Sequence, residues 1–433
     1  MKPRTLLQKS SLWLANLTVG GLWGRSLAPH QQRNLRWFWF DGLFSSASDN
    51  IMINFVSLYI LALGASEAQI GLMSSFSSIA CAILLLPGAL LAERLGRRKL
   101  IALFCYGGAR LAILLLVFVP ILFKGPNLVW IAIGFSVLRD SFTNLAYPAW
   151  MDVINEIVPI EGRGRYFGSR NFIMNVTGMI ATLLAGKLIT LFVTNQGYQI
   201  ALGLAFVLGA FSTFSYSHIR AMSVPAVTLK GSGFSLRKIT SMLKGQPQFI
   251  ALVVTAAFWN FAVNISSPFF NVYMVHNLKF TATSVGFLAV VSILSTLATQ
   301  NQIGALADRV SARRLQLAGM LMIPLLPFAW LFATQVWHVA IINTFSGVMW
   351  GLYNLVSFNL LLASIPHDQV PWFSAVYQVI VMLSLALGAL VGSTLIARWS
   401  FIPVLIVSGA CRFLAAAFFA WKVHDPPQTV PAA

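Results

Sequence analysis

Apolar segments long enough to cross a membrane recur along the whole chain, separated by short polar segments. A helix needs about 20 predominantly apolar residues to cross the hydrocarbon layer of a bilayer. The first half of the chain offers six such segments, near residues 37–63, 68–92, 100–123, 128–156, 166–194 and 197–218. The second half offers six more, near residues 247–276, 281–307, 315–335, 338–364, 373–398 and 400–422. The pattern predicts an all-α membrane protein with twelve transmembrane helices.

The remaining segments define the predicted domain organisation. Residues 1–36 form an N-terminal tail whose apolar stretch is too short to span, and no convincing small-residue cleavage site follows it. We therefore expect this tail to lie partly on the membrane surface rather than to act as a signal peptide. Residues 219–246 are the predicted linker between two six-helix bundles at 37–218 and 247–422, and residues 423–433 are the C-terminal tail.

Basic residues are distributed unequally between the two sides of the predicted bundle. Most of the 29 Lys and Arg residues fall in the N-terminal tail, the linker and alternate loops, whereas the opposite side holds only Lys124, Lys279 and Arg398. Loops rich in Lys and Arg stay in the cytoplasm. Both termini are therefore predicted to be cytoplasmic, in a plasma (inner) membrane.

Composition supports a membrane protein and excludes several other classes. Hydrophobic residues make up 58% of the chain and charged residues 9%, against about 25% charged in soluble domains. The net charge of +18 does not indicate nucleic-acid binding, because the basic residues lie in short tracts between apolar spans. Cys81, Cys105 and Cys411 all fall inside apolar spans, so neither a disulfide framework nor a metal site is indicated.

Two charged hairpins, about half a chain length apart, suggest that the chain is duplicated. Residues 89–100 read Ala-Leu-Leu-Ala-Glu-Arg-Leu-Gly-Arg-Arg-Lys-Leu, and residues 304–315 read Gly-Ala-Leu-Ala-Asp-Arg-Val-Ser-Ala-Arg-Arg-Leu. Each hairpin lies between two apolar runs. Asn264 of the seventh span occupies the position equivalent to Asp49 of the first span. Two copies at this spacing are far more specific than either hairpin alone.

Both hairpins resemble the signature loop of the major facilitator superfamily, Gly-x-Leu-Ala-Asp-Arg-x-Gly-Arg-Arg. The first copy departs from it at Ala89 and Glu93, and the second at Ser311 and Ala312. The resemblance implies two six-helix bundles related as parallel repeats, with substrate bound near the midplane and transported by alternating access.

The resemblance also implies a cytoplasmic gate. The first hairpin would lock the outward-open state, with Glu93 near the start of the eleventh helix and Arg97 or Arg98 reaching Asp152. The alternative is that these charges only set topology. The expected gate residues are Glu93, Arg94, Gly96, Arg97, Arg98, Asp152, Gly304, Asp308, Arg309 and Arg313.

Charges inside the spans are the best pointers to function, because such charges are costly and usually face a cavity. Asp49 lies twelve residues into the first span, about 18 Å along a helix and hence near the midplane. Asp41, one turn in, is expected at the level of the headgroups. Arg139 and Asp140 are adjacent and point about 100° apart, so each is expected to find its partner on another helix, with Arg110 pairing with Asp140 as a structural possibility.

Polar residues at similar depth complete the predicted pathway. Those of the second half are uncharged, so a coupled ion would be bound in the first half, and Arg412 in the last span is expected to be structural. The predicted pathway residues are Asp49, Asn50, Asn54, Arg139, Asp140, Asn144, Tyr147, Trp259, Asn260, Asn264, Asn354, Tyr377 and Gln378.

Asp49 is the leading candidate to carry a coupling proton. It is acidic, lies near the midplane and shares the widest polar face in the chain. Two alternatives stay open: a permanent Asp49–Arg139 salt bridge, and a carboxylate that binds a cation without proton coupling.

The sequence thus predicts a secondary transporter that moves a small solute. The six histidines lie in tails, loops or span ends, and no phosphate-binding glycine-rich loop is present, which disfavours a membrane enzyme or an ATP-driven pump. Proton coupling, or coupling to sodium, is expected; an uncoupled facilitator, a channel and a non-transporting scaffold are the alternatives. We expect no cofactor, a monomer in the lipid bilayer and no nucleic-acid partner. The fifth span lacks the Gly-Pro motif of many drug–proton antiporters, which disfavours that subclass.

Overall fold

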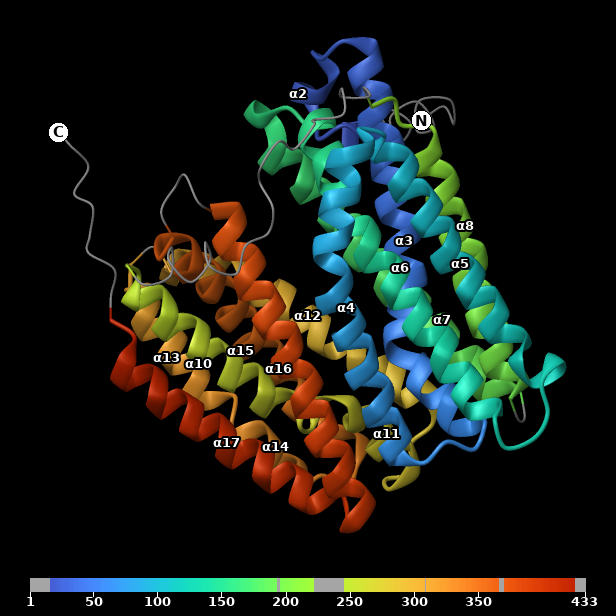
Figure 1. Cartoon of the computed structure of the whole chain (residues 1–433), viewed down its shortest axis with the longest axis vertical. Helices are drawn as coiled ribbons and strands as arrows, with labels where there is room; N and C mark the ends of the chain where they lie inside the picture. Colours follow the sequence, from blue (N-terminus) through green and yellow to red (C-terminus); the bar gives the residue numbers. More distant parts are fainter. Residues whose placement is uncertain (1–15, 193–194, 222–244, 308, 366–369, 425–433) are drawn as a thin grey trace, which may run out of the picture. The chain divides into compact units, whose positions relative to one another are not determined.

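The computed structural model describes residues 16–192, 195–221, 245–307, 309–365 and 370–424, and these residues are almost entirely helical (Figure 1). Each of the twelve predicted spans contains at least one helix. The first six correspond to α3 (Pro29–Ala62), α4 (Glu67–Leu95), α5 (Arg98–Leu122), α6 (Leu128–Ile157), α7 (Arg163–Leu191) and α8 (Gln196–Ser217). A short α2 (Leu22–Arg25) precedes them, and the 3-10 turn η1 (Ile160–Gly162) precedes α7.

The second six spans include two interrupted helices. They comprise α10 (Pro247–Asn264), η2 (Ser267–Phe269) and α11 (Phe270–His276); α12 (Ala282–Ala307); α13 (Ala312–Met322) and α14 (Leu325–Trp330); α15 (Val336–Ala363); α16 (Val370–Arg398); and α17 (Phe401–Lys422). Within the described ranges, nine helices are long and apolar enough to cross a membrane. α3, α6 and the α13–α14 pair are not among them, because Ser, Thr, Asn and charged residues together lower the mean hydropathy of α3 and α6, and Pro324 interrupts the ninth span.

The interruption of the seventh span follows from Pro268. A proline has no backbone N–H, and its ring excludes the carbonyl four residues earlier, which here belongs to Asn264, the last residue of α10. Freed carbonyls must find other donors in an apolar setting. α17 supplies them: the Ser408 hydroxyl donates to Ala262 O at 2.6 Å, and Arg412 donates to Val263 O at 3.2 Å.

The first long helix begins earlier than the hydrophobic pattern predicts. α3 starts at Pro29 rather than near residue 37, so Arg33 and Arg36 belong to its first turns and not to the tail. Proline is favoured at the first helical position because its missing N–H has no partner there in any case. The 34 residues of α3 extend about 51 Å, against about 30 Å of hydrocarbon, so this helix reaches well into the headgroup region.

The chain folds as two compact units. The first comprises Met1–Gly64 and Leu84–Thr228, and the second comprises Ala65–Ile83 and Leu229–Ala433. The first half of α4 is thus part of the second unit, where it packs on α16: Ser75 donates to Ala386 O at 3.0 Å, and Ser393 donates to Ala68 O at 2.7 Å.

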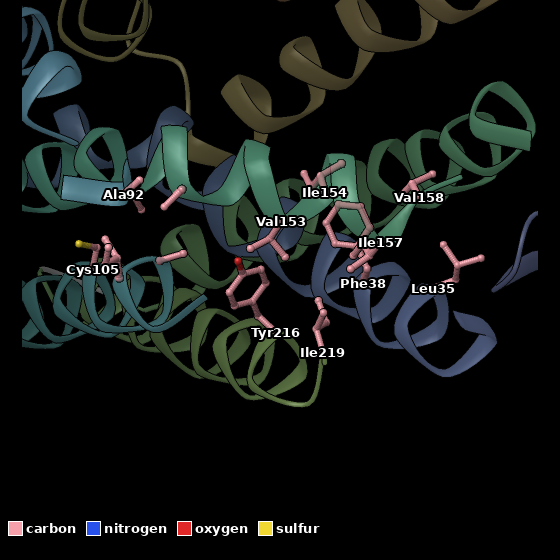
Figure 2. Close-up of a cluster of buried hydrophobic side chains, with 14 of the residues drawn as sticks. Leu35, Phe38, Ala92, Cys105, Val153, Ile154, Ile157, Val158, Tyr216 and Ile219 are labelled. Atoms are coloured by element: carbon pink, nitrogen blue, oxygen red, sulfur yellow. The ribbon is translucent and has the colours of Figure 1, made fainter. Parts of the chain in front are cut away.

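A buried hydrophobic cluster holds one end of the first unit together (Figure 2). Leu35 and Phe38 of α3 meet Val153 and Ile154 of α6 in this cluster, together with Tyr216 of α8. These side chains are almost fully buried. This packing fixes α3, the helix that carries Asp49, against its neighbours.

Two glycines let α10 and α16 approach closely, as the Gly388-x-x-x-Gly392 spacing predicts. A Cβ at Gly388 would lie 2.3 Å from Phe261 O, and one at Gly392 would lie 2.1 Å from Ile265 O. Both neighbours are backbone atoms, which cannot move aside cheaply.

Gly392→Ala should therefore lower the thermal stability of the purified protein, at a cost of about 1–3 kcal/mol for an overpacked contact. Gly203→Ala in α8 is the matched control, because a Cβ there meets nothing within 4 Å and alanine favours a helix by about 1 kcal/mol over glycine. Equal melting temperatures for the two variants would show that the α10–α16 contact does not depend on the missing side chain.

Candidate functional site

Four charged side chains form a continuous network in the first unit. Asp49 of α3 accepts from Arg139 of α6 at 2.7 Å and from Arg110 of α5 at 3.5 Å, and Arg139 also pairs with Asp140 at 2.8 Å. Arg110 donates in addition to the Ser48 hydroxyl at 3.3 Å. Two carboxylates and two guanidinium groups compensate each other here, as buried ionic groups require.

The four members differ in exposure. The Asp49 side chain is 37% exposed, whereas those of Arg139 and Arg110 are 14% and 8% exposed. The two cations are therefore fixed in the protein interior, and the carboxylate between them reaches open space. This is the arrangement expected of a carboxylate that exchanges a proton or contacts a ligand.

The pairing within the network corrects two predictions. Arg110 pairs with Asp49 rather than with Asp140, and Asp140 pairs with its own neighbour Arg139. An arginine side chain is long enough to bridge the angle between consecutive helical residues, so the 100° separation did not force the two groups onto different helices.

Four of the predicted asparagines donate a hydrogen bond within their own helices. The amides of Asn50, Asn54, Asn144 and Asn260 each donate to the carbonyl four residues earlier, at 2.8–2.9 Å. Asn264 instead donates to Leu385 O of α16 at 2.7 Å. These bonds satisfy amide donors in an apolar setting, and that of Asn264 also holds two helices together.

Asp41, which we expected at the level of the headgroups, is buried within the first unit. It accepts from Ser212 of α8 at 2.7 Å and pairs with Arg170 of α7 at 3.3 Å. Arg170 also lies 4.0 Å above the Phe38 ring and donates to Phe38 O. The sequence analysis did not identify Arg170, near the start of the predicted fifth span, as a partner of Asp41. The sequence feature that reflects this contact is the glycine after Asp41. A Cβ at Gly42 would lie 2.6 Å from Arg170 Nε, so a side chain there would obstruct the arginine.

An aromatic cluster dominates the corresponding region of the second unit. Trp259 of α10 stacks on Tyr353 of α15, with ring centroids 5.2 Å apart, and lies 6.4 Å from Trp350. Trp350, Tyr377 and Gln378 are half-buried and Asn354 is exposed, as is Tyr147 of the first unit.

Arg412 has a structural environment, in agreement with its expected role. It is 2% exposed and donates to Val263 O and to the Ser266 hydroxyl. No carboxylate pairs with it in the part of the chain that the structure describes. Its positive charge lies at the carbonyl end of α10, where a cation is favourable.

The first charged hairpin contains the expected contact to the fourth span. Arg98, rather than Arg97, pairs with Asp152 at 3.4 Å, with side chains 28% and 41% exposed. Gly96 adopts φ of +60° in the turn, a conformation that glycine accepts without strain. Arg94 and Arg97 are exposed, and the Glu93 side chain and Asp308 lie outside the described residues.

The second hairpin uses different turn chemistry. Ser311, which stands where the family pattern has glycine, caps α13 by accepting from Arg314 N. Arg313 donates to the Ala420 and Val423 carbonyls at the end of α17. Gly304 has open space around it, and Arg309 is exposed. The second hairpin therefore joins helices of its own unit.

Known proteins resemble this chain along most of its length. Residues 38–275 and 259–433 match the model of the Major Facilitator Superfamily. A multi-drug resistance efflux pump PmrA homolog of Lactococcus lactis is 23% identical, over 86% of this chain and 90% of its own length. Multidrug resistance protein MdtG of Yersinia enterocolitica is 22% identical, over 92% and 94%.

Solved transporter structures share the fold. A D-xylose-proton symporter superposes with a TM-score of 0.68 at 14% identity, covering 90% of this chain and 97% of that one. The nucleoside transporter NupG gives 0.68 at 12% identity, covering 89% and 98%. With the helical architecture and the two signature hairpins, these matches show that the chain belongs to the major facilitator superfamily and is a secondary transporter that works by alternating access.

Proposed function

We propose that this transporter is driven by protons and that Asp49 carries the coupling proton. The observation that supports this role is the position of the Asp49 carboxylate, 37% exposed and held between the guanidinium groups of Arg139 and Arg110 on two other helices. A proton or a pair of cations can neutralise this carboxylate, and a conformational change can favour either state.

Asp140 lowers the free-energy cost of protonating Asp49 by remaining paired with Arg139. When Asp49 takes up a proton, its attraction for Arg139 is lost, and an unpaired buried cation would be strongly destabilising. Arg139 keeps a carboxylate partner in Asp140, 2.8 Å away. When Asp49 is released, Arg139 therefore keeps a carboxylate partner, and Arg110 keeps its hydrogen bond to the Ser48 hydroxyl.

The second half offers no comparable group. Its acidic residues are Asp308, Asp368 and Asp425, all in loops or the tail by sequence. Proton coupling is therefore assigned to the first unit, where the carboxylates at membrane depth are Asp41, Asp49 and Asp140. Sodium coupling and uncoupled transport are the alternatives that the experiment must separate.

For the substrate we propose amphiphilic organic molecules, exported in exchange for protons. One relative named a multi-drug resistance efflux pump homolog and another named a multidrug resistance protein align over most of the chain. The aromatic surface of Trp350 and Tyr377, backed by Trp259, suits flat apolar ligands. The missing Gly-Pro motif in the fifth span marks a difference from many drug–proton antiporters. The proposed setting is the plasma membrane, with both termini cytoplasmic and the protein monomeric.

We further propose that Arg98 and Asp152 form a cytoplasmic latch. The pair joins the hairpin at the start of α5 to the inner end of α6. An exposed ion pair contributes only about 0–1 kcal/mol. That is too little to fix a fold but enough to shift a balance between two transport states several-fold.

Asp49→Asn should abolish proton-driven transport while preserving substrate exchange, because the amide cannot carry the proton but fills the same space. The measurement is uptake of a fluorescent lipophilic cation into proteoliposomes with a pH gradient, with a sodium gradient and with neither. Glu161→Gln, an exposed carboxylate outside the network, is the matched control and should transport normally. Gradient-driven accumulation at the wild-type level would remove Asp49 from the mechanism. Recovery of accumulation in Asp49→Asn combined with Arg139→Gln would instead identify a purely structural salt bridge.

Arg98→Ala should shift the protein toward its inward-open state, whereas Arg97→Ala should not, because only Arg98 contacts Asp152. The labelling rate of a cysteine at Tyr147, introduced after replacing Cys81, Cys105 and Cys411, reports the shift. Asp152→Asn should reproduce the effect of Arg98→Ala, and the double variant should add nothing. Equal labelling in the Arg97 and Arg98 variants would contradict the latch.

A further inference from the structure

The first turns of α3 form a basic and aromatic cavity that the transport mechanism does not use. The cavity has a volume of about 440 Å³ and is lined by Pro29, Gln32, Arg33, Arg36, Trp37 and Phe40. These residues recur at helical spacing and so share one face of α3. We propose that this cavity binds the headgroup of an anionic phospholipid, whose acyl chains lie along the neighbouring aromatic surface.

The charge of the cavity favours an anionic ligand. Arg33 and Arg36 are both exposed, and no ion pair involves either of them among the residues that the structure describes. Groups three residues apart on a helix are neighbours, and like charges at that spacing repel. A phosphodiester between the two guanidinium groups relieves this repulsion and accepts charge-assisted hydrogen bonds from both.

The cavity lies at the depth of lipid headgroups. Arg36 and Arg33 precede Asp49 by about four helical turns, which corresponds to about 20–24 Å along α3. Half of the hydrocarbon layer is about 15 Å, and the headgroup region extends to about 20–22 Å from the midplane. With Asp49 near the midplane, both guanidinium groups reach the phosphates of the leaflet on the side of the N-terminus.

An apolar surface continues from the cavity along α3 and α8. Trp37 lies 6.3 Å from Phe214, and Phe44 lies 5.5 Å from Phe211, measured between ring centroids. Phe211 and Phe214 are 51% and 56% exposed, as suits side chains that face lipid. His218 stacks on Trp37 at 4.4 Å and holds the indole in place.

Two arginines next to an exposed aromatic surface favour a lipid over a free anion as the ligand. Inorganic phosphate would satisfy the two arginines but would leave the aromatic surface without a ligand. An anionic lipid matches both, because basic residues at the cytoplasmic surface attract anionic headgroups and tryptophan prefers the interface. The bound lipid would steady the outer turns of the helix that carries Asp49.

The test uses the full-length protein in nanodiscs of phosphatidylcholine with a small fraction of phosphatidylglycerol that carries a photoreactive acyl chain. Wild-type protein should crosslink to this lipid on the segment around Phe40 and Phe44. Arg33→Gln combined with Arg36→Gln should weaken the lipid's apparent affinity about 30-fold, from the attraction of two basic residues for an anionic surface.

The matched control is Arg165→Gln combined with Arg314→Gln, which removes the same charge from two other exposed arginines. It should change the affinity less than about threefold. An equal loss of lipid affinity in both double variants would show that only the general surface charge matters, and it would contradict the proposed site. Unchanged crosslinking in the Arg33 and Arg36 variant, or its displacement by millimolar inorganic phosphate, would also overturn it. Crosslinking measures binding and not transport, so the result does not depend on proton coupling.

Discussion

Charge compensation in a low-dielectric interior governs the first unit. Three carboxylates, Asp41, Asp49 and Asp140, are matched by the three guanidinium groups of Arg110, Arg139 and Arg170. Isolated charges in this setting would cost several kcal/mol each. The helices that carry them, α3, α5, α6 and α7, are therefore held by ion pairs as well as by the hydrophobic cluster at one end of the unit.

The two ion-pair systems differ in what they can do. The Asp41–Arg170 pair is buried on both sides and is completed by Ser212 and the Phe38 ring, so it resembles a fixed support. The Asp49 network is partly open and has a spare carboxylate in Asp140. Aspartate and arginine thus form a rigid pair at Asp41 and a network suited to proton exchange at Asp49. The difference between the two is the exposure of the carboxylate.

Much of the fold follows from the sequence, and less of the site does. Apolar length predicted a helix in each of the twelve segments, and the glycine spacing at Gly388 and Gly392 indicated close packing against another helix, which the structure identifies as α10. The start of α3 at Pro29 was missed because its first turns are polar, and hydrophobicity marks the lipid-facing part of a helix rather than its end. The pairings of Arg110 and Arg170 were missed because the depth of a residue along its helix does not determine which neighbouring helix a long side chain reaches.

The capping of α10 by Arg412 has a consequence for the response of the two halves to acid. Each guanidinium group at membrane depth in the first unit is balanced by a carboxylate, and a proton can abolish that balance. Arg412 is balanced by backbone carbonyls and a serine hydroxyl, which do not take up protons in the physiological range. The electrostatic environment of Arg412 is therefore insensitive to pH. Acidification in the physiological range therefore leaves the partners of Arg412 unchanged, whereas it acts on the carboxylates that balance Arg110, Arg139 and Arg170.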